Sequence, residues 1–402
     1  MSVSMKDILH AAELIRGTTV ITPCTRSLLL TKMTGAEIIL KFENHQFTAS
    51  FKDRGALVKL LSLSAEERSR GVIAMSAGNH AQAVAYHAQR IGMPATIVMP
   101  EHTPFTKVEH TKAFGAEVHL YGETLKEARL KAEAIASERD LVMIHPYDDP
   151  KVIAGQGTVA LEMLEAFPDL DLLVVPVGGG GLISGMAIAA KAINPDIVII
   201  GVESERFPSM QQMLNNEPVS CASRTIAEGI AVKAPGELTL PIVRQMVDEI
   251  MLVDEARIEE AIGMLLEVEK SVVEGAGAAG LAAVLANRDY FQGKRIGLVL
   301  TGGNIDMFTL SSVIERGLVR SGHLVQLRVD IPDEPDALAA IATLLGDTNA
   351  NIIQVYHQRA FTHLSIRQVR VEFVLQVLGP DHVHQLLAVL HANGYEAKVH
   401  TP

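Results

Sequence analysis

Short apolar runs alternate with longer amphipathic stretches along most of the chain. The runs are continuous and rich in Val, Ile and Leu, which is typical of strands buried on both faces of a parallel sheet. Strands alternating with helices predict an α/β fold, and the length suits two parallel sheets with a site in the crevice between them. The expected strands are residues 72–75, 95–99, 117–120, 141–144, 172–175, 197–202 and 296–300, and the expected helices include 80–91, 124–138 and 181–193.

After residue 322 the pattern changes. Apolar and polar residues alternate over 325–331, as in a half-buried strand, and an amphipathic helix follows. Two strands, a second helix and a final strand at 395–399 complete the order βαββαβ, which predicts a ferredoxin-like unit. The expected domains are 1–322, with a smaller inserted half at about 50–150, and 323–402.

Composition narrows the class of protein. The net charge is −12 and tryptophan is absent, which argues against a nucleic-acid partner. The two cysteines, Cys24 and Cys221, belong to no metal-like or redox-like pair, and we see no ligand cluster that predicts a metal site. Residues 1–10 lack the apolar core of a secretory signal, and the uncharged stretch 172–190 contains glycines and a proline that suit a membrane span poorly. We therefore expect a cytoplasmic protein.

The first candidate for chemistry is Lys52. It directly follows Phe51 in the segment Thr48-Ala49-Ser50-Phe51-Lys52-Asp53-Arg54-Gly55-Ala56, at the start of a predicted helix and in an apolar neighbourhood. An amine held there loses its proton more easily than free lysine, whose pKa is roughly 10.4, and can then attack a carbonyl. The alternative is an ordinary solvated lysine.

Three more segments each follow a predicted strand. Ser76-Ala77-Gly78-Asn79-His80 gathers a hydroxyl, an amide and backbone N–H groups at a helix start, which suits a substrate carboxylate, although a capped turn is the alternative. Gly178-Gly179-Gly180-Gly181-Leu182 suits a phosphate cradled by N–H groups, but a tight structural turn is also compatible with it. Its spacing is that of neither a dinucleotide nor a nucleotide loop. Thr301-Gly302-Gly303-Asn304 can place a hydroxyl in the crevice, or be a common turn.

In this order the four segments resemble those of the serine/threonine dehydratases, pyridoxal-phosphate enzymes of fold type II, and most of all the threonine dehydratases. The resemblance implies that Lys52 binds the cofactor covalently and that Phe51 packs against its ring. It implies that Asn79 hydrogen-bonds the cofactor's 3-hydroxyl and that Thr301 faces its pyridine nitrogen. The loop Gly178, Gly179, Gly180, Gly181 and Leu182 would hold the phosphate, and Ser76, Ala77, Gly78, Asn79 and His80 would hold the substrate carboxylate.

The C-terminal unit resembles an ACT domain, a module that binds amino acids between paired copies. The segment 333–338 matches its first turn, except that Asp336 stands where the family usually has glycine. An acidic side chain there could repel an effector's carboxylate. The resemblance implies an amino-acid effector and a homodimer or homotetramer.

We therefore expect a threonine ammonia-lyase, which converts L-threonine to 2-oxobutanoate and ammonia, and also L-serine to pyruvate. One alternative is a serine racemase of the same fold, but racemases tend to have serine where this chain has Ala77. The other is a catalytically idle amino-acid sensor. Biosynthesis of isoleucine and amino-acid breakdown both remain open as the metabolic role.

Overall fold

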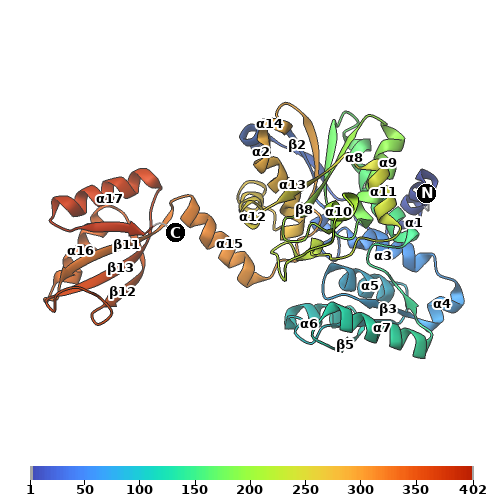
Figure 1. Ribbon diagram of the computed structural model, residues 1–402, viewed down its shortest axis with the longest axis horizontal. Helices are drawn as coiled ribbons and strands as arrows, with labels where there is room; N and C mark the ends of the chain where they lie inside the picture. The colour runs from blue at the N-terminus through green and yellow to red at the C-terminus, as the bar shows by residue number, and fades with distance from the viewer. Residues whose placement is uncertain (1–2, 401–402) are drawn as a thin grey trace. The chain divides into compact units, whose positions relative to one another are not determined.

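The computed structural model describes residues 3–400, which form two compact units (Figure 1). The first is Met1–Ile305 and the second is Asp306–Pro402. The division precedes helix α15 (Met307–Arg320), whereas we expected the joint after this helix, at 322/323. The difference arises because α15 contacts β11 (Leu324–Pro332) in the C-terminal unit, and sequence periodicity does not reveal such a contact.

The larger sheet of the first unit has six strands in the order β1-β2-β10-β7-β8-β9. All neighbours are parallel except β1 and β2. The strands are β1 (Cys24–Ser27), β2 (Glu37–Lys41), β7 (Leu172–Pro176), β8 (Val198–Ser204), β9 (Glu249–Val253) and β10 (Arg295–Val299). The sequence predicted β7, β8 and β10, whereas β1, β2 and β9 were missed. The short strand β1 has a mostly exposed, polar sequence without the apolar run of a buried strand.

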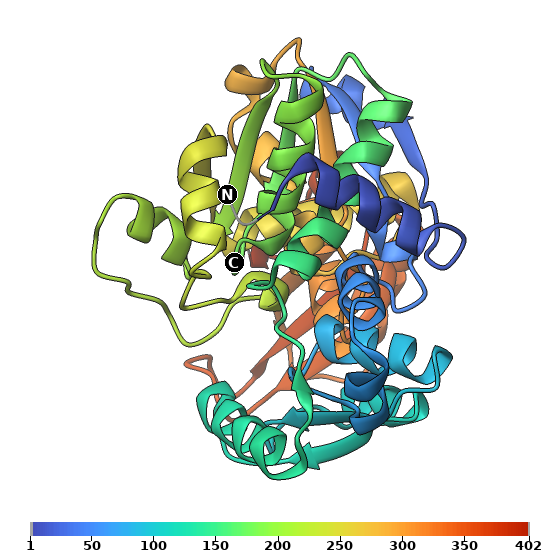
Figure 2. The same cartoon turned by 90° about the vertical axis from the view of Figure 1, so that its right-hand side faces the viewer.

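The smaller sheet has four parallel strands in the order β5-β4-β3-β6. They are β3 (Val72–Met75), β4 (Ala95–Met99), β5 (Glu117–Leu120) and β6 (Val142–Met143), and its helices include α5 (Asn79–Arg90), α6 (Phe105–Ala113) and α7 (Leu125–Arg139). All four strands lie where they were predicted, within one or two residues. The two parallel sheets of the α/β prediction are thus confirmed, and Figure 2 shows the smaller one below the larger.

Local sequence explains several helix starts. The Thr124 hydroxyl accepts from the Glu127 N–H while the Glu127 carboxylate accepts from the Thr124 N–H, so a capping box begins α7. Asp149 caps α8, whose first residue is Pro150. The remaining helices of this unit are α1 (Met5–Ile15), α2 (Leu28–Thr34), η1 (Glu43–His45), α3 (Lys52–Leu61), α4 (Ala65–Arg70), α8 (Pro150–Ala166), α9 (Gly181–Ile193), α10 (Ser209–Leu214), η2 (Glu228–Ile230), α11 (Thr239–Met246), α12 (Glu255–Glu269), α13 (Gly275–Ala286) and α14 (Arg288–Phe291).

Helix α3 belongs to both halves of this unit. Its residues Leu57 and Val58 are buried in the core of the larger half, around α8, α9 and β7. Ala56 and Leu60, on another face of the same helix, are buried in the core of the smaller half, around α5, β3 and β4. Helix α3 is therefore packed into the cores of both halves.

After α15, the C-terminal unit has the predicted βαββαβ order, followed by no further element within the described residues. Its four strands form an antiparallel sheet in the order β12-β13-β11-β14, as in ferredoxin-like folds. After β11 come α16 (Ala337–Asp347), β12 (Asn351–Gln358), β13 (Gln368–Gln376), α17 (Pro380–Ala392) and β14 (Ala397–His400). Their apolar faces form a separate core.

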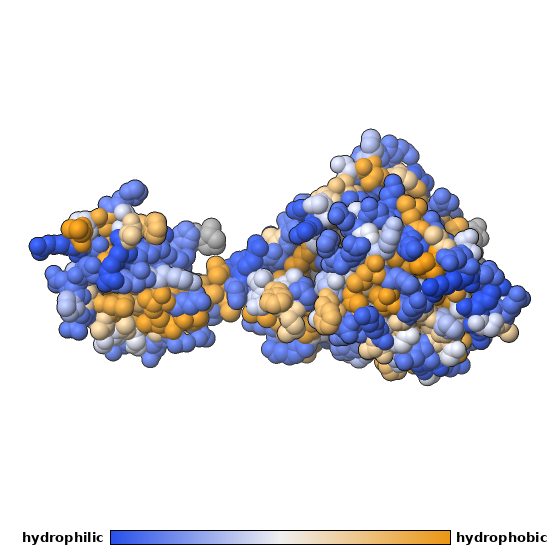
Figure 3. All heavy atoms as spheres, turned by 90° about the horizontal axis from the view of Figure 1, so that it is seen from below, coloured by the Kyte–Doolittle hydropathy of each residue, from blue (hydrophilic) through white to orange (hydrophobic). Residues whose placement is uncertain are grey.

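The surface of each unit carries hydrophobic as well as hydrophilic residues (Figure 3). Phe361 and Ile366, in the segment between β12 and β13, are 95% and 97% exposed. Over residues 3–400, no helix combines the length and apolar character that crossing a bilayer requires.

Candidate active site

Lys52 is the first residue of α3 and is partly buried. Its Nζ atom donates a hydrogen bond of 2.7 Å to the Pro146 carbonyl, and lies 5.1 Å from the centre of the Phe51 ring. Burial lowers the pKa of Lys52 to about 8, although the negative charge of Glu274 acts in the opposite direction. An appreciable fraction of this amine is therefore unprotonated, and nucleophilic, near neutral pH.

The segment before Lys52 pairs with the segment that contains Thr301. Phe51 N donates to the Thr301 carbonyl at 3.0 Å, and Ser50 and Gly302 form an antiparallel bridge. Thr301 follows β10 and is buried, and its hydroxyl has no hydrogen-bond partner among residues 3–400. Two motifs far apart in the sequence therefore lie side by side, with the Thr301 hydroxyl available to a ligand.

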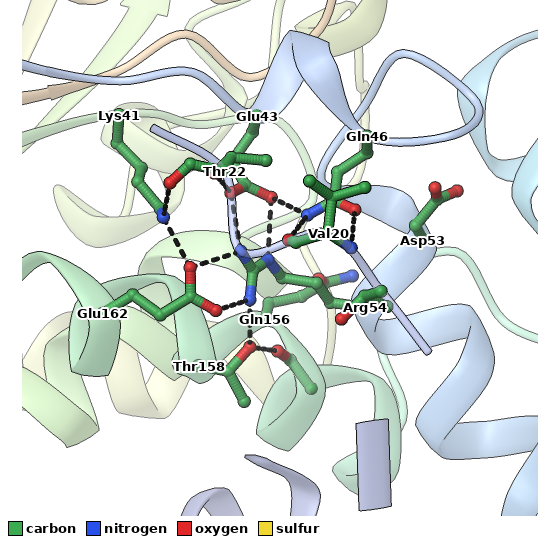
Figure 4. A network of polar contacts seen from close by, with 12 residues as sticks. Val20, Thr22, Lys41, Glu43, Gln46, Asp53, Arg54, Gln156, Thr158 and Glu162 are labelled. Atoms are coloured by element: carbon green, nitrogen blue, oxygen red, sulfur yellow. Dashed lines mark hydrogen bonds and ion pairs between the residues drawn. The ribbon is translucent and has the colours of Figure 1, made fainter. Parts of the chain in front are cut away.

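A buried network of charges holds α3 in this position (Figure 4). Arg54 is completely buried, and its guanidinium donates to Glu43 at 2.7 and 2.8 Å and to Thr158 at 3.1 Å. It also binds Glu162 of α8, which accepts from Lys41 of β2. Although burial opposes its ionisation, the Arg54 charge keeps the pKa of Glu43 below its usual value. The network fixes the helix that begins with Lys52 to the larger half.

A glycine contact completes the support of α3. A Cβ atom on Gly155 of α8 would lie 2.6 Å from the Gly55 Cα atom, so only glycine permits the observed approach of the two helices. The same side of α3 carries the Arg54 network, so the first turn is held by both backbone contact and charge.

The segment Ser76-Ala77-Gly78-Asn79-His80 connects β3 to α5, with Gly78 at the N-cap. The Ser76 hydroxyl accepts from Gly78 N at 3.2 Å. Within residues 3–400 the N–H groups of Ala77, Asn79 and His80 have no hydrogen-bond acceptor, so they can bind a carboxylate at the positive end of the helix.

Asn79 connects this segment to the rest of the site. Its Nδ2 donates to Glu274 Oε1 at 2.7 Å, and its Oδ1 accepts from Asn304 Nδ2, also at 2.7 Å. Asn304 donates in addition to the Thr48 carbonyl at 2.9 Å. Residues of the first, second and fourth motifs are therefore joined directly.

The His80 side chain points elsewhere. It is buried, and its Nε2 lies 2.9 Å from the Ile144 carbonyl at the end of β6. Burial, with the nearby Lys52 charge, lowers the pKa of His80 to about 3, so the imidazole is neutral and donates to this carbonyl. Its ring supports the loop, and only its backbone N–H is free for a ligand.

The glycine loop precedes α9, with Gly180 at the N-cap and φ at +91°. A Cβ atom on Gly179 would lie 2.3 Å from the Tyr147 ring. The N–H groups from Gly179 to Leu182 have no acceptor among the described residues, whereas the Gly179 carbonyl accepts from Thr239 Oγ1 at 2.6 Å. Since Tyr147 directly follows Pro146, which binds Lys52, the loop adjoins the lysine through this segment. Gly178 precedes these residues and packs against Val232 and Ile230.

Sequence reasoning missed Glu274, which occupies the N-cap position of α13 but whose side chain makes no capping hydrogen bond. Burial raises its pKa to about 7, although the bond from Asn79 acts against this. A Cβ atom on Gly302 would lie 2.5 Å from Glu274 Oε1, so glycine at 302 leaves room for the carboxyl. The available signal was a lone acidic residue directly before an uncharged run, 275–283, that is Gly and Ala except for Leu281.

These residues suit pyridoxal phosphate. The aldehyde of this cofactor needs an unprotonated amine, its phosphate needs N–H donors at a helix start, and its ring needs flanking polar groups. Lys52, the free N–H groups of the glycine loop, Asn79 and the Thr301 hydroxyl meet these needs. In the described part of the chain, no group of three or more His, Cys, Asp or Glu residues could hold a metal ion.

Known proteins are similar to this chain over most of its length. The chain is 44% identical over 400 residues to L-threonine ammonia-lyase of Thermotoga maritima, covering 99% of each chain. The structure of threonine deaminase isoform 2 from Solanum lycopersicum, in its processed form, matches with a TM-score of 0.73 and 36% identity, covering 77% of this chain and 86% of that one. Maize serine racemase matches with a TM-score of 0.74 and 36% identity, covering 80% of this chain and 99% of that one. The model of the pyridoxal-phosphate dependent enzymes matches residues 15–302, and the chain therefore belongs to this family.

Proposed function

We propose that this protein removes ammonia from L-threonine to give 2-oxobutanoate, and from L-serine to give pyruvate. The observation that carries the proposal is the meeting of Lys52, Asn79 and Thr301, from three separate segments, at one site where burial lowers the pKa of the lysine amine. The similarity to the ammonia-lyase of Thermotoga maritima along the whole chain favours threonine as the substrate.

Each group of the site has a role in this proposal. Pyridoxal phosphate supplies an electron sink that makes the substrate Cα proton acidic. The Lys52 amine, which otherwise binds the cofactor, removes that proton as a general base. Hydroxide leaves from Cβ with a proton, and the water lost is balanced by the water that hydrolyses the resulting imine to the 2-oxo acid and ammonia. The charge network around Arg54 keeps the lysine in place.

The other residues bind and orient. The N–H groups from Gly179 to Leu182 hold the phosphate, and Phe51 packs against the cofactor ring. Asn79, whose amide is oriented by Glu274 and Asn304, contacts the 3-hydroxyl, while Thr301 faces the pyridine nitrogen. The N–H groups near Ala77 and His80, with the Ser76 hydroxyl, hold the substrate carboxylate.

The serine racemase alternative belongs to the same fold, as the maize enzyme illustrates. Ala77 has no hydroxyl, and therefore cannot donate a proton to the face of the substrate opposite Lys52. This favours elimination over racemisation.

The C-terminal residues 323–402 are proposed to be an ACT-type regulatory domain. Its βαββαβ order supports this assignment, as does a groove beside the start of α16 that could accept an amino acid. Asp336, the residue before α16, lies in the left-handed region with φ at +68°, as a glycine would. Its carboxylate would weaken binding of an amino acid's carboxylate, so feedback control would be weak or altered. Pairing of such domains would make the protein a homodimer or homotetramer.

The test measures 2-oxobutanoate release from L-threonine by the purified protein with added pyridoxal phosphate. L-serine and D-serine are assayed in parallel, and Lys52→Ala is the comparison variant. We expect rapid release by the wild type and a loss of at least about 10³-fold in the variant. Conversion of D-serine to L-serine without any 2-oxo acid would favour the racemase. If the protein converts none of the three amino acids, the remaining interpretation is the catalytically idle amino-acid sensor. The proposed location is the cytoplasm. Inhibition by L-isoleucine would support a role in isoleucine biosynthesis, and insensitivity to it would support a role in amino-acid breakdown.

A further inference from the structure

Two neighbouring residues of α3 face opposite halves of the catalytic unit. Arg54 points into the charge network of the larger half, whereas Asp53 is turned away from it (Figure 4). Asp53 is completely buried and accepts from Thr48 N at 3.1 Å and from the Thr48 hydroxyl. Beyond Thr48, the group that it approaches is His87, which belongs to α5 of the smaller half.

His87 is an unusual buried residue. Its side chain is 0% exposed, and neither ring nitrogen has a hydrogen-bond partner. An unsatisfied buried polar group destabilises the fold, and an apolar residue of similar size would avoid this penalty. Burial, with the nearby Arg90 charge, lowers the pKa of His87 to about 3, so the imidazole is neutral. Its Nε2 atom lies 3.7 Å from Asp53 Oδ1, too far for a hydrogen bond, so the ring and the carboxyl meet as neighbouring polar groups and not as an ion pair. The orientation of the ring against the carboxyl therefore needs an explanation other than packing.

The position of Asp53 and His87 in the fold supplies an explanation. Asp53 directly follows Lys52, and His87 lies two turns along the helix that begins with Asn79. Around α3 and α5 the core of the smaller half contains small and apolar side chains such as Ala56, Ala81 and Val84, which can slide past one another. Asp53 and His87 bring polar groups to this packing, and polar groups depend more strongly on orientation.

We propose that His87 is a positioning residue that, with Asp53, sets the placement of α5 on α3 and so holds the 76–80 loop at the distance from Lys52 that the substrate requires. This inference rests on the proposed function, because the loop is taken to bind the substrate carboxylate. Loss of the pair displaces the loop and leaves Lys52 in place, since Arg54 holds α3 from the other side.

The test compares KM and kcat for L-threonine in the full-length enzyme with pyridoxal phosphate. We expect His87→Phe and Asp53→Asn each to raise KM at least about tenfold and to change kcat less than about threefold, because a carboxylate contact acts in both ground and transition states. The double variant should resemble each single one, since each removes the same interaction. Val84→Ala is the control. It leaves a cavity on the same helix, and should lower Tm without raising KM.

Unchanged KM in both single variants, or additive effects in the double variant, would overturn the proposal. If His87→Phe fails to fold, the KM of the isosteric variant Asp53→Asn tests the proposal by itself. Hydrogen exchange of the 76–80 segment separates this proposal from the enzyme activity. If the wild type releases no 2-oxo acid, the proposed function fails, but faster exchange in His87→Phe than in Val84→Ala still supports the positioning role. Equal exchange in these two variants would refute it.

Discussion

The Asn79 side-chain amide donates a 2.7 Å hydrogen bond to the carboxyl of Glu274, 195 positions further along the chain. The bond joins the loop that follows β3 in the smaller half to the start of α13 in the larger half. A carboxyl whose pKa is raised to about 7 thereby lies in the same site as an amine whose pKa is lowered to about 8. The charge of each one affects the ionisation of the other.

Replacement of Glu274 by Gln should lower the pKa of Lys52 further. The carboxylate is ionised at pH 8 and raises the lysine pKa, so its loss leaves desolvation less opposed. The pH midpoint for the reaction of the cofactor-free protein with pyridoxal phosphate, followed by absorbance, should fall by up to about one unit. Glu260→Gln, which removes a carboxylate from the middle of α12, is the control and should not shift the midpoint. A midpoint that rises in Glu274→Gln would contradict the electrostatic argument.

Replacement of Arg54 by Met should strongly destabilise the catalytic unit. It leaves the fully buried Glu43 carboxylate without its principal partner, and breaking a buried ion pair in this way costs about 3–5 kcal/mol. The free energy of unfolding in urea measures the loss. Arg26→Ala removes a half-exposed partner of Glu37 and should cost less than about 1 kcal/mol. If both variants lose the same free energy of unfolding, the buried network stabilises the fold no more than a surface ion pair does.

Replacement of Gly179 by Ala should weaken cofactor binding. The added Cβ atom would meet the Tyr147 ring, so the loop or the ring must move, at a cost of about 1–3 kcal/mol. We expect at least a tenfold rise in the dissociation constant for pyridoxal phosphate, measured by fluorescence titration. Gly263→Ala on α12 meets no atom within 4 Å and should bind the cofactor normally. Normal binding by Gly179→Ala as well would exclude the loop from the phosphate site.

Replacement of His80 by Gln should reduce the sensitivity of the fold to acid. The folded pKa of His80 is about 3, whereas the unfolded value is 6.5. Below pH 6.5 the unfolded chain therefore binds a proton that the folded protein does not, and stability falls as the pH falls. This contribution, on the order of 2–3 kcal/mol at pH 4.5, is absent in the variant. Urea unfolding at pH 7.5 and 4.5 measures it, and an equal loss in both proteins would mean that His80 is already charged in the fold.

Much of the organisation could be read from local patterns. Apolar runs bounded by glycine and polar residues predicted all four strands of the smaller sheet, and the change of period after residue 322 predicted the βαββαβ unit. The four motifs were recognisable in the sequence because each combines a strand end or helix start with a characteristic side chain. Strand β1 escaped prediction, since its burial is slight and its place in the sheet comes only from pairing with β2.

The sequence by itself determined the fold class and the family and singled out Lys52 as the candidate amine, because these depend on periodicity and on residues close together in the chain. Only the tertiary structure identified Glu274 as the partner of Asn79, placed His87 beside Asp53, and joined the His80 ring to the Ile144 carbonyl. The physical reason is that pKa values and hydrogen-bond partners depend on burial and on neighbours from distant segments. These neighbours meet only when the two sheets pack around α3.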